Sequence, residues 1–340
     1  MNSLERTRSA IRSESVDYAP GFPILIAPAC QLVGVKLGDY FQEPTVMAET
    51  LIEARALCGF DGIYVSRDNW VYHEAMGGEM VFPEDDESYG PSPVLLSIKE
   101  FGKLKIPDPW RAAGMQTVLS AARKVVEQVG GEFYIQANID CGPFSLGGVL
   151  RGIEEFMMDC VVEEAGLIQE YLEFCTEVVI AYGKAMIGTG VHGVQFGDSV
   201  SSLVGVDMFE RLVLPYEQKT SEGLKSDRCD LWVHICGKTD HILPMVATLP
   251  IQGFELDALT KVGEARRLIG PNIALKGNLD TTFLLQETPE AVYQATQLII
   301  KAHGSTSNLV FSPGCGVPRM TPLENLKAMV HACQDCRPGH

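Results

Sequence analysis

The stretch from Leu231 to Lys238 reads LWVHICGK, and it joins an apolar run to two side chains that can bind a metal. The apolar run is typical of a strand that is buried on both faces. Because side chains alternate between the two faces of a strand, His234 and Cys236 project to the same side. Imidazole and thiolate are both common ligands of zinc. The stretch therefore predicts a buried strand that ends in part of a zinc site.

A third zinc ligand is expected from Cys315, which lies in the stretch SPGCGVP over residues 312–318. The glycines and prolines fix a turn there, and the apolar run 308–311 places that turn after a strand. One His, two Cys and an open position are typical of catalytic zinc, whereas structural zinc takes four protein ligands. The alternative is that the three side chains are ordinary core residues, since free Cys is often buried.

Outward from this strand, short apolar runs alternate with helical patterns along the whole chain. We expect strands over residues 23–27, 61–66, 133–138, 193–197, 231–236, 253–256, 273–276 and 309–312. We expect helices over 44–57, 153–187 (one or two), 262–269, 289–302 with Thr288 as N-cap, and 322–333 with Thr321 as N-cap. This alternation predicts an α/β fold of the (β/α)8 TIM-barrel type, with eight parallel strands and the active site at the C-terminal mouth.

We expect residues 1–340 to form a single domain of this type. A helical extension occupies about residues 1–20, and an insertion follows the second strand at about residues 70–115. Prolines and an acidic run in the insertion indicate loops with short elements. A segment of this length beside a strand end is more often functional than idle.

Polar side chains gather at or just past the C-terminal ends of the expected strands. In a parallel barrel these ends form one face, where active sites are built. The residues there are Asp68, Asp140, Asp198, His234, Cys236, Asp257, Asn278 and Cys315. Asp198, Asp68 and Asn278 are equally compatible with capping the segments that follow them.

The composition excludes several classes of partner. A formal net charge of −17 argues against binding to nucleic acid or to an anionic membrane surface. The sequence has no apolar run long enough for a transmembrane helix, and its first residues lack the apolar core of a signal peptide. Ten cysteines without a secretory signal predict reduced thiols in the cytoplasm. The oligomeric state stays open at this level.

The motifs resemble those of a known family, the methylcobalamin:coenzyme M methyltransferases of the uroporphyrinogen decarboxylase superfamily. The matching stretches are HICG (234–237), LKGN (275–278), SPGCG (312–316) and MTPLENL (320–326), with weaker matches at 59–62, 67–68 and 142–144. The resemblance is strong from about residue 190 to the end and looser before. It implies a barrel whose zinc is held by His234, Cys236 and Cys315.

The resemblance also implies the reaction and its partners. A methyl group would pass from methylcobalamin, carried on a separate methylated corrinoid protein, to a small zinc-bound thiol such as coenzyme M. The family has a displaceable glutamate as fourth ligand, and here the matching residue is Asp257, with Glu255 close by. Asp198 would receive the thiol proton or support a ligand. From their position at the strand ends, we expect Asp68, Asp140 and Asn278 to contact the corrinoid cofactor.

Three other functions compete with thiol methylation. A corrinoid-loading methyltransferase would use the same zinc to demethylate a methoxylated or halogenated compound. Uroporphyrinogen decarboxylase needs no metal, but the region that matches its arginine-rich motif, residues 24–34, has no arginine. A non-catalytic barrel would keep a closed, structural zinc and only bind a corrinoid protein.

Overall fold

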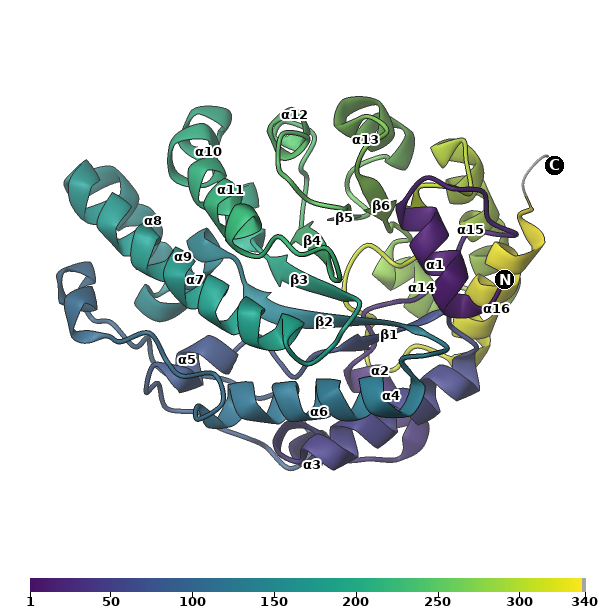
Figure 1. Cartoon of the computed structure of the whole chain (residues 1–340), viewed down its shortest axis with the longest axis horizontal. Helices are drawn as coiled ribbons and strands as arrows, with labels where there is room; N and C mark the ends of the chain where they lie inside the picture. The colour runs from purple at the N-terminus through teal and green to yellow at the C-terminus, as the bar shows by residue number, and fades with distance from the viewer. Residues whose placement is uncertain (338–340) are drawn as a thin grey trace.

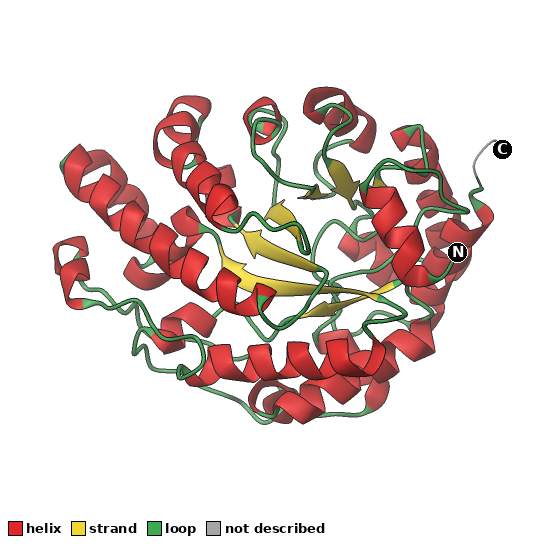
Figure 2. Ribbon diagram, viewed as in Figure 1, coloured by secondary structure: helices red, strands yellow, loops and turns green. Residues whose placement is uncertain are grey.

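The computed structural model describes residues 1–337 and shows one parallel sheet surrounded by helices (Figure 1, Figure 2). Its seven strands pair in the order of the sequence, and each is joined to the next through at least one helix. Such helical crossovers are what parallel neighbours require, and the result is the TIM-barrel-like α/β fold that the sequence predicts. The strands are β1 (Gly62–Val65), β2 (Tyr134–Cys141), β3 (Gly193–Gly197), β4 (Asp230–Ile235), β5 (Gly253–Leu256), β6 (Ala274–Lys276) and β7 (Leu309–Val310).

The helices cover the outer face of the sheet, and the expected helices over 262–269 and 289–302 are confirmed. Within residues 1–337, none of the helices is both long and apolar enough to cross a membrane. The helices are α1 (Ser3–Ile11), α2 (Ala27–Val33), α3 (Leu37–Gln42), α4 (Pro44–Cys58), α5 (Val71–Ala75), η1 (Ile98–Lys103), α6 (Ala113–Val129), α7 (Pro143–Arg151), α8 (Ile153–Val162), α9 (Ala165–Ile187), η2 (Ser199–Leu203), α10 (Val206–Leu212), α11 (Leu214–Gly223), α12 (Leu243–Val246), α13 (Val262–Ile269), α14 (Thr281–Gln286), α15 (Pro289–His303) and α16 (Leu323–Asp335).

The first of the eight expected strands, over residues 23–27, is not found in the structure. Pro23 has no amide hydrogen to give to a ladder, and α2 already begins at Ala27. The chain instead contacts both edges of the sheet slightly earlier, at Gly21. Gly21 forms a parallel bridge with Phe311 beyond β7, and its carbonyl accepts the amide of Asp61, before β1, at 2.9 Å. A single bridged residue, Gly21, therefore stands near the place where the first of the eight strands was expected.

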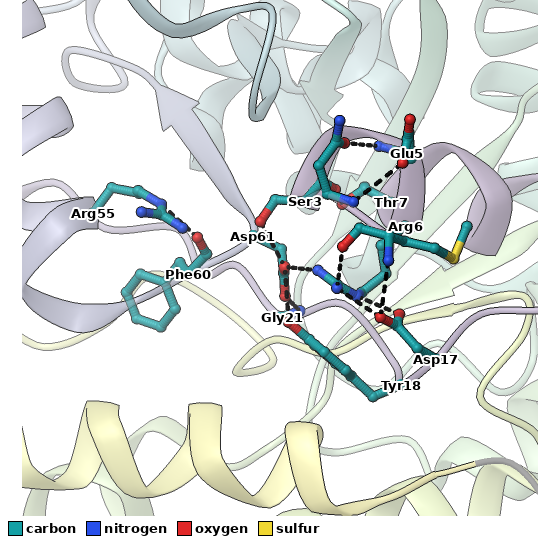
Figure 3. Close-up of polar contacts among 12 residues, drawn as sticks. Ser3, Glu5, Arg6, Thr7, Asp17, Tyr18, Gly21, Arg55, Phe60 and Asp61 are labelled. Atoms are coloured by element: carbon teal, nitrogen blue, oxygen red, sulfur yellow. Dashed lines mark hydrogen bonds and ion pairs between the residues drawn. The ribbon is translucent and has the colours of Figure 1, made fainter.

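The N-terminal end of the sheet is tied together by a buried ion pair (Figure 3). Arg6 of α1 donates to Asp61 at 2.7 Å and to Asp17 at 2.6 Å. Asp61 also accepts hydrogen bonds from Ser3 at 2.9 Å and from the amide of Gly21 at 3.1 Å. These bonds attach α1 to the start of β1, at the opposite end of the molecule from α8 in Figure 1.

The N-caps expected at Thr288 and Thr321 have different outcomes. Thr288 caps α15, because its hydroxyl accepts the amide hydrogen of Ala291, as predicted. The N-cap expected at Thr321 is wrong, since α16 begins at Leu323 after Pro322, and the Thr321 hydroxyl donates to the carbonyl of Pro318 at 2.8 Å. Pro322 instead takes the N-cap position, and no side chain caps this helix start.

Candidate metal centre and its cavity

Three side chains that can bind a metal meet at the ends of β4 and β7. His234 lies in β4, Cys236 directly follows it, and Cys315 lies in the loop after β7. His234 Nε2 is 2.8 Å from Cys236 Sγ, which is 3.4 Å from Cys315 Sγ. The three ligand atoms all lie within 4.8 Å of one another, and within the described chain no carboxylate belongs to this group. The curled sheet thus joins two cysteines that are 79 positions apart.

Close packing fixes the loop that carries Cys315. The amide of Gly314 donates to the carbonyl of Leu279 at 2.8 Å, and Leu279 forms a parallel bridge with Pro313. A Cβ atom at Gly314 would lie 2.4 Å from the backbone nitrogen of Ala258, which is closer than a side chain can come. Only glycine lets the two loops approach in this way. The SPGCG stretch therefore holds its cysteine against the neighbouring strand ends.

A backbone contact decides which nitrogen of His234 faces the sulfurs. Nδ1 lies 3.1 Å from the carbonyl oxygen of Glu255, on the neighbouring strand β5. Because a carbonyl only accepts, Nδ1 carries a hydrogen and Nε2 is the nitrogen available to a metal. Burial opposes a charge on this ring, but the contact with Cys315 and the charge of Glu255 raise the pKa of His234 above its usual value.

The two thiols differ in acidity because they bond to each other. The hydrogen bond from Cys315 lowers the pKa of Cys236, whereas the same contact raises the pKa of Cys315 to about 12. A dication that bound both sulfurs would hold both as thiolates and end this asymmetry. Two sulfurs and one imidazole nitrogen are a donor set of catalytic zinc, with one position left for another ligand. The residues present therefore fit zinc.

A buried polar cluster lies behind the His234 ring. Lys276 Nζ is 3.0 Å from Glu255 Oε1 and 2.8 Å from Gln136 Oε1, and Gln136 Nε2 is 2.8 Å from the same Glu255 oxygen. Glu255 was a candidate from the sequence, whereas neither Lys276 nor Gln136 was assigned a role, although Lys276 is part of the LKGN stretch. The signal that Lys276 and Gln136 share is a polar residue within a strand that was expected to be buried on both faces.

Neither of the two acids proposed as a fourth ligand belongs to the group of three ligand atoms in the described chain. Glu255 lies on the Nδ1 side of His234, at 3.9 Å. Asp257 accepts backbone amide hydrogens on both oxygens, from Gly237 at 2.8 Å and from Leu259 at 2.9 Å. Asn278 donates to the carbonyl of Asp257 at 2.9 Å. Asp257 and Asn278 therefore hold the loop that follows β5.

The sequence left two roles open for Asp198, acid–base chemistry or capping of the segment that follows it. In the structure Asp198 caps a helix, but this helix is α7, which comes before it in the chain. Asp198 is fully buried and accepts the amide hydrogens of Ser145 at 2.6 Å and of Phe144 at 3.3 Å, in the first turn of α7. Burial raises the pKa of Asp198 to about 6, against the lowering effect of these bonds. The contact fixes the start of α7 beside the end of β3.

A cavity of about 560 Å³ adjoins the three candidate ligands, and all three line it. Asp68 and Asp140 also line it, whereas Asn278, Asp257 and Asp198 do not. The insertion after β1 contributes one wall. Further lining residues are Ile24, Phe41, Tyr64, Ser88, Gln195 and Arg319.

The two acids of the cavity wall sit in different environments. Asp68 pairs with Arg67 at 3.0 Å and accepts the hydroxyl of Ser88 at 2.6 Å. Asp140 has a left-handed backbone (φ 65°) and accepts the amide hydrogen of Val71 at 3.1 Å. Burial, and secondarily the charge of Asp68, raise the pKa of Asp140 to about 7. Asp140 can therefore gain or lose a proton near neutral pH.

Comparisons with known proteins agree with this architecture. Methylcobamide:CoM methyltransferase MtaA of Methanosarcina barkeri is 29% identical, and the match covers 96% of each chain. A uroporphyrinogen decarboxylase of Trichlorobacter lovleyi is 26% identical, over 96% of this chain and 94% of the relative. The solved structure of a methyltransferase from Methanosarcina mazei superposes with a TM-score of 0.89 at 25% identity and covers 98% of both chains.

The family model described as uroporphyrinogen decarboxylase (URO-D) matches residues 2–336, which is nearly the whole chain. The fold also occurs in a more distant structure, a B12-independent methionine synthase from Shewanella sp. W3-18-1, with a TM-score of 0.57 at 15% identity. That likeness concerns the fold alone. The chain belongs to the uroporphyrinogen decarboxylase family, and within it the chain is similar along almost its full length to methylcobamide:CoM methyltransferases.

Proposed function

We propose that this protein is a zinc-dependent methyltransferase that moves a methyl group from a methylcorrinoid to a thiol. The observation that carries the proposal is the group formed by His234, Cys236 and Cys315, whose ligand atoms lie within 4.8 Å of one another at the wall of a cavity. Relatives named methylcobamide:CoM methyltransferases supply the class of donor and acceptor. A methylated corrinoid protein and a small thiol such as coenzyme M are the proposed partners.

Each residue of the centre has a task in this proposal. Zinc held by His234 Nε2 and the two sulfurs would supply the positive charge that keeps a substrate thiol deprotonated. The thiolates of Cys236 and Cys315 donate electron density, so that the nucleophile stays reactive. The bond from His234 Nδ1 to the Glu255 carbonyl keeps Nε2 aimed at the sulfurs. Asp257, whose charge acts on the Cys236 thiol, remains the proposed displaceable ligand.

The proposed reaction balances without a further reactant. A carbon–sulfur bond forms between the methyl group and the thiol sulfur, and the cobalt–carbon bond breaks. Its electron pair stays on cobalt, which leaves as Co(I), and the thiol proton is released. Asp140 lines the cavity and is able to hold a proton near neutral pH, which makes it a candidate acceptor beside the predicted Asp198. Asp68 and Asp140, which line the cavity, are the proposed contacts of the corrinoid, and Asn278 supports the loop that follows β5.

Decarboxylation of uroporphyrinogen is the second candidate, because decarboxylases of that name are among the relatives. A substrate with many carboxylates calls for unpaired cations in the cavity. The two arginines that line it are paired with acids, Arg67 with Glu74 at 2.7 Å and Arg319 with Asp85 at 2.7 Å. The sulfur-rich centre would also have no task in that reaction. The cavity therefore favours methyl transfer.

The test is to mix zinc-loaded protein with methylcobalamin and a panel of small thiols that includes coenzyme M. We expect the spectrum of cob(I)alamin to appear under anaerobic conditions, together with one methyl thioether per methylcobalamin consumed. Metal-free protein should give neither product. The reverse assay, cob(I)alamin with methoxylated compounds, tests the corrinoid-loading alternative. Consumption of uroporphyrinogen with no reaction of any thiol would refute the proposal.

A further inference from the structure

Behind the candidate metal centre, three strands contribute one polar side chain each to the interior of the sheet. Glu255 of β5, Lys276 of β6 and Gln136 of β2 are at most 3% exposed. Their contacts of 2.8–3.0 Å join the Lys276 ammonium, one oxygen of Glu255 and the Gln136 amide in a closed triangle. Two buried charges cost much solvation free energy, and a fold keeps them most readily where they serve a specific geometry.

One atom of this cluster has no partner. Glu255 Oε2 is buried and makes no hydrogen bond within the described part of the chain. Native proteins rarely leave such an acceptor unpaired, so the exception calls for an explanation. His234 Nδ1 lies 3.9 Å from Oε2, while the same nitrogen is 3.1 Å from the backbone carbonyl of Glu255. The free oxygen thus stands beside the hydrogen that Nδ1 carries.

We propose that Glu255, held in place by Lys276 and Gln136, is a positioning residue for the metal-binding imidazole of His234 and not a metal ligand. The inference rests on the proposed function, and it reassigns a residue that the sequence suggested as a fourth ligand. The geometry supports this positioning role, because the sulfurs face Nε2 of His234 whereas Glu255 faces Nδ1, at the opposite side of the ring. A carboxylate there orients the ring and makes its other nitrogen a stronger donor.

Lys276 explains how the carboxylate keeps its orientation. Its ammonium and the Gln136 amide both bind Oε1, which leaves Oε2 turned toward His234. The ammonium also lies 4.2 Å from the ring centre of Phe22 and 5.0 Å from that of Tyr64, so aromatic faces surround the charge. Lys276 therefore balances the negative charge of Glu255 without contacting the sulfurs.

The decisive variant is Glu255→Gln, which keeps the side-chain shape and the backbone carbonyl but removes the carboxylate charge. The matched control is Asp61→Asn, the same carboxylate-to-amide change in the buried ion pair with Arg6 at the other end of the sheet. Zinc affinity is measured by competition with a chromophoric chelator, the visible spectrum is recorded after substitution with Co(II), and Tm is measured for both. Glu255→Gln with Lys276→Met removes the remaining charge as well.

We expect Glu255→Gln and the double variant to bind zinc about 10–100-fold more weakly and to shift the Co(II) bands, as loss of a carboxylate behind a metal-bound His does elsewhere. Asp61→Asn should lower Tm and leave both metal readouts unchanged. If the Glu255 variants bind zinc as tightly as the parent, or if Glu255→Gln fails to fold while Asp61→Asn folds, the cluster is structural and the inference is wrong. Failure of the parent itself to bind zinc would refute the proposed function instead.

Discussion

The two ends of the sheet bury polar groups in opposite ways. At the N-terminal end, Asp61 accepts hydrogen bonds from four donors, Arg6 among them. At the C-terminal end, the thiols of Cys236 and Cys315 bond to each other, and Glu255 leaves an oxygen unpaired within the described chain. The cluster around Asp61 has its polar atoms satisfied within the fold, whereas the metal centre and Glu255 have capacity left for a ligand.

This difference separates the residues that stabilise the fold from those proposed to act on a substrate. Fully paired buried groups tie α1 to the start of β1, and their loss should reduce stability. Strained and under-bonded groups are typical of ligand sites, and Asp140 adds a left-handed backbone at the same end. Variants at the N-terminal end should therefore change Tm, and variants at the C-terminal end should change metal binding and methyl transfer.

The largest expected effect is that of Cys315→Ser at the C-terminal end. Serine replaces a thiolate by a hydroxyl that stays protonated and binds zinc poorly. We expect zinc affinity to fall and methyl transfer to drop by at least about 100-fold, a loss of roughly 3 kcal/mol of transition-state stabilisation. Steady-state assay with methylcobalamin and a thiol measures the rate.

The control for this prediction is Cys336→Ser, a partly buried cysteine just past the end of α16. Its thiol lies outside the group of candidate ligands, so zinc content and rate should match those of the parent. Circular dichroism should show both variants folded. Equal rates for Cys315→Ser and the parent would mean that the centre has been assigned to the wrong residues.

Arg6→Met tests the opposite end of the comparison. The change leaves the carboxylate of Asp61 without its cation, in a pair whose Arg6 and Asp61 side chains are 6% and 5% exposed. Breaking a buried pair in this way costs about 3–5 kcal/mol of unfolding free energy. Urea unfolding measures the loss, and zinc bound per folded molecule should stay the same. A zinc deficit in the folded fraction would contradict the separation of the two ends.

Asp140→Asn tests the charge state of the cavity wall. The folded pKa of Asp140, about 7, lies above the ordinary 3.8, so its stability contribution is present at low pH and is lost as pH rises toward 7. Asn keeps the shape and tolerates the left-handed backbone. From pH 5 to pH 8.5, the unfolding free energy of the variant should therefore rise by roughly 2–3 kcal/mol relative to that of the parent. Urea unfolding at both pH values checks this, and a pH-independent difference would disprove the shift.

The smallest expected effect is that of Ser199→Ala. The Ser199 hydroxyl accepts the backbone amide hydrogen of Cys236 at a long distance of 3.3 Å, and the contact of the same hydroxyl with the Cys236 side chain helps to lower the pKa of that thiol. Loss of one such bond should weaken zinc binding by roughly two- to tenfold. Chelator competition resolves a change of this size. A loss as large as that of Cys315→Ser would show that the hydroxyl does more than support the loop.

Local patterns in the sequence were enough to predict most strands and the three candidate ligands. The strand over 253–256 and the helix over 262–269 agree with the structure residue by residue. His234 and Cys236 could be paired because strand geometry is local, and Cys315 was marked by glycines and prolines at a strand end. These inferences needed no knowledge of which strands are neighbours beyond the order of a parallel barrel.

Contacts across the interior could not be predicted in the same way. Glu255 and Lys276 are 21 positions apart and meet only because β5 and β6 are adjacent, while Gln136 comes from β2, on another part of the sheet. The strand expected at residues 23–27 failed because an apolar run with Pro23 reads as a strand, although a proline cannot complete the ladder. The loops around Asp257 likewise depend on tertiary hydrogen bonds, which no residue pattern encodes.

X-ray absorption at the zinc edge, recorded with and without a thiol substrate, shows whether the centre is an open zinc site. We predict one zinc per chain, bound by two sulfurs and one imidazole nitrogen together with one light ligand. Addition of coenzyme M or another reactive thiol should raise the sulfur count to three, as the thiol takes the remaining position. A sulfur count that stays unchanged, in protein that methylates the same thiol, would show that the thiol does not bind to zinc during the reaction.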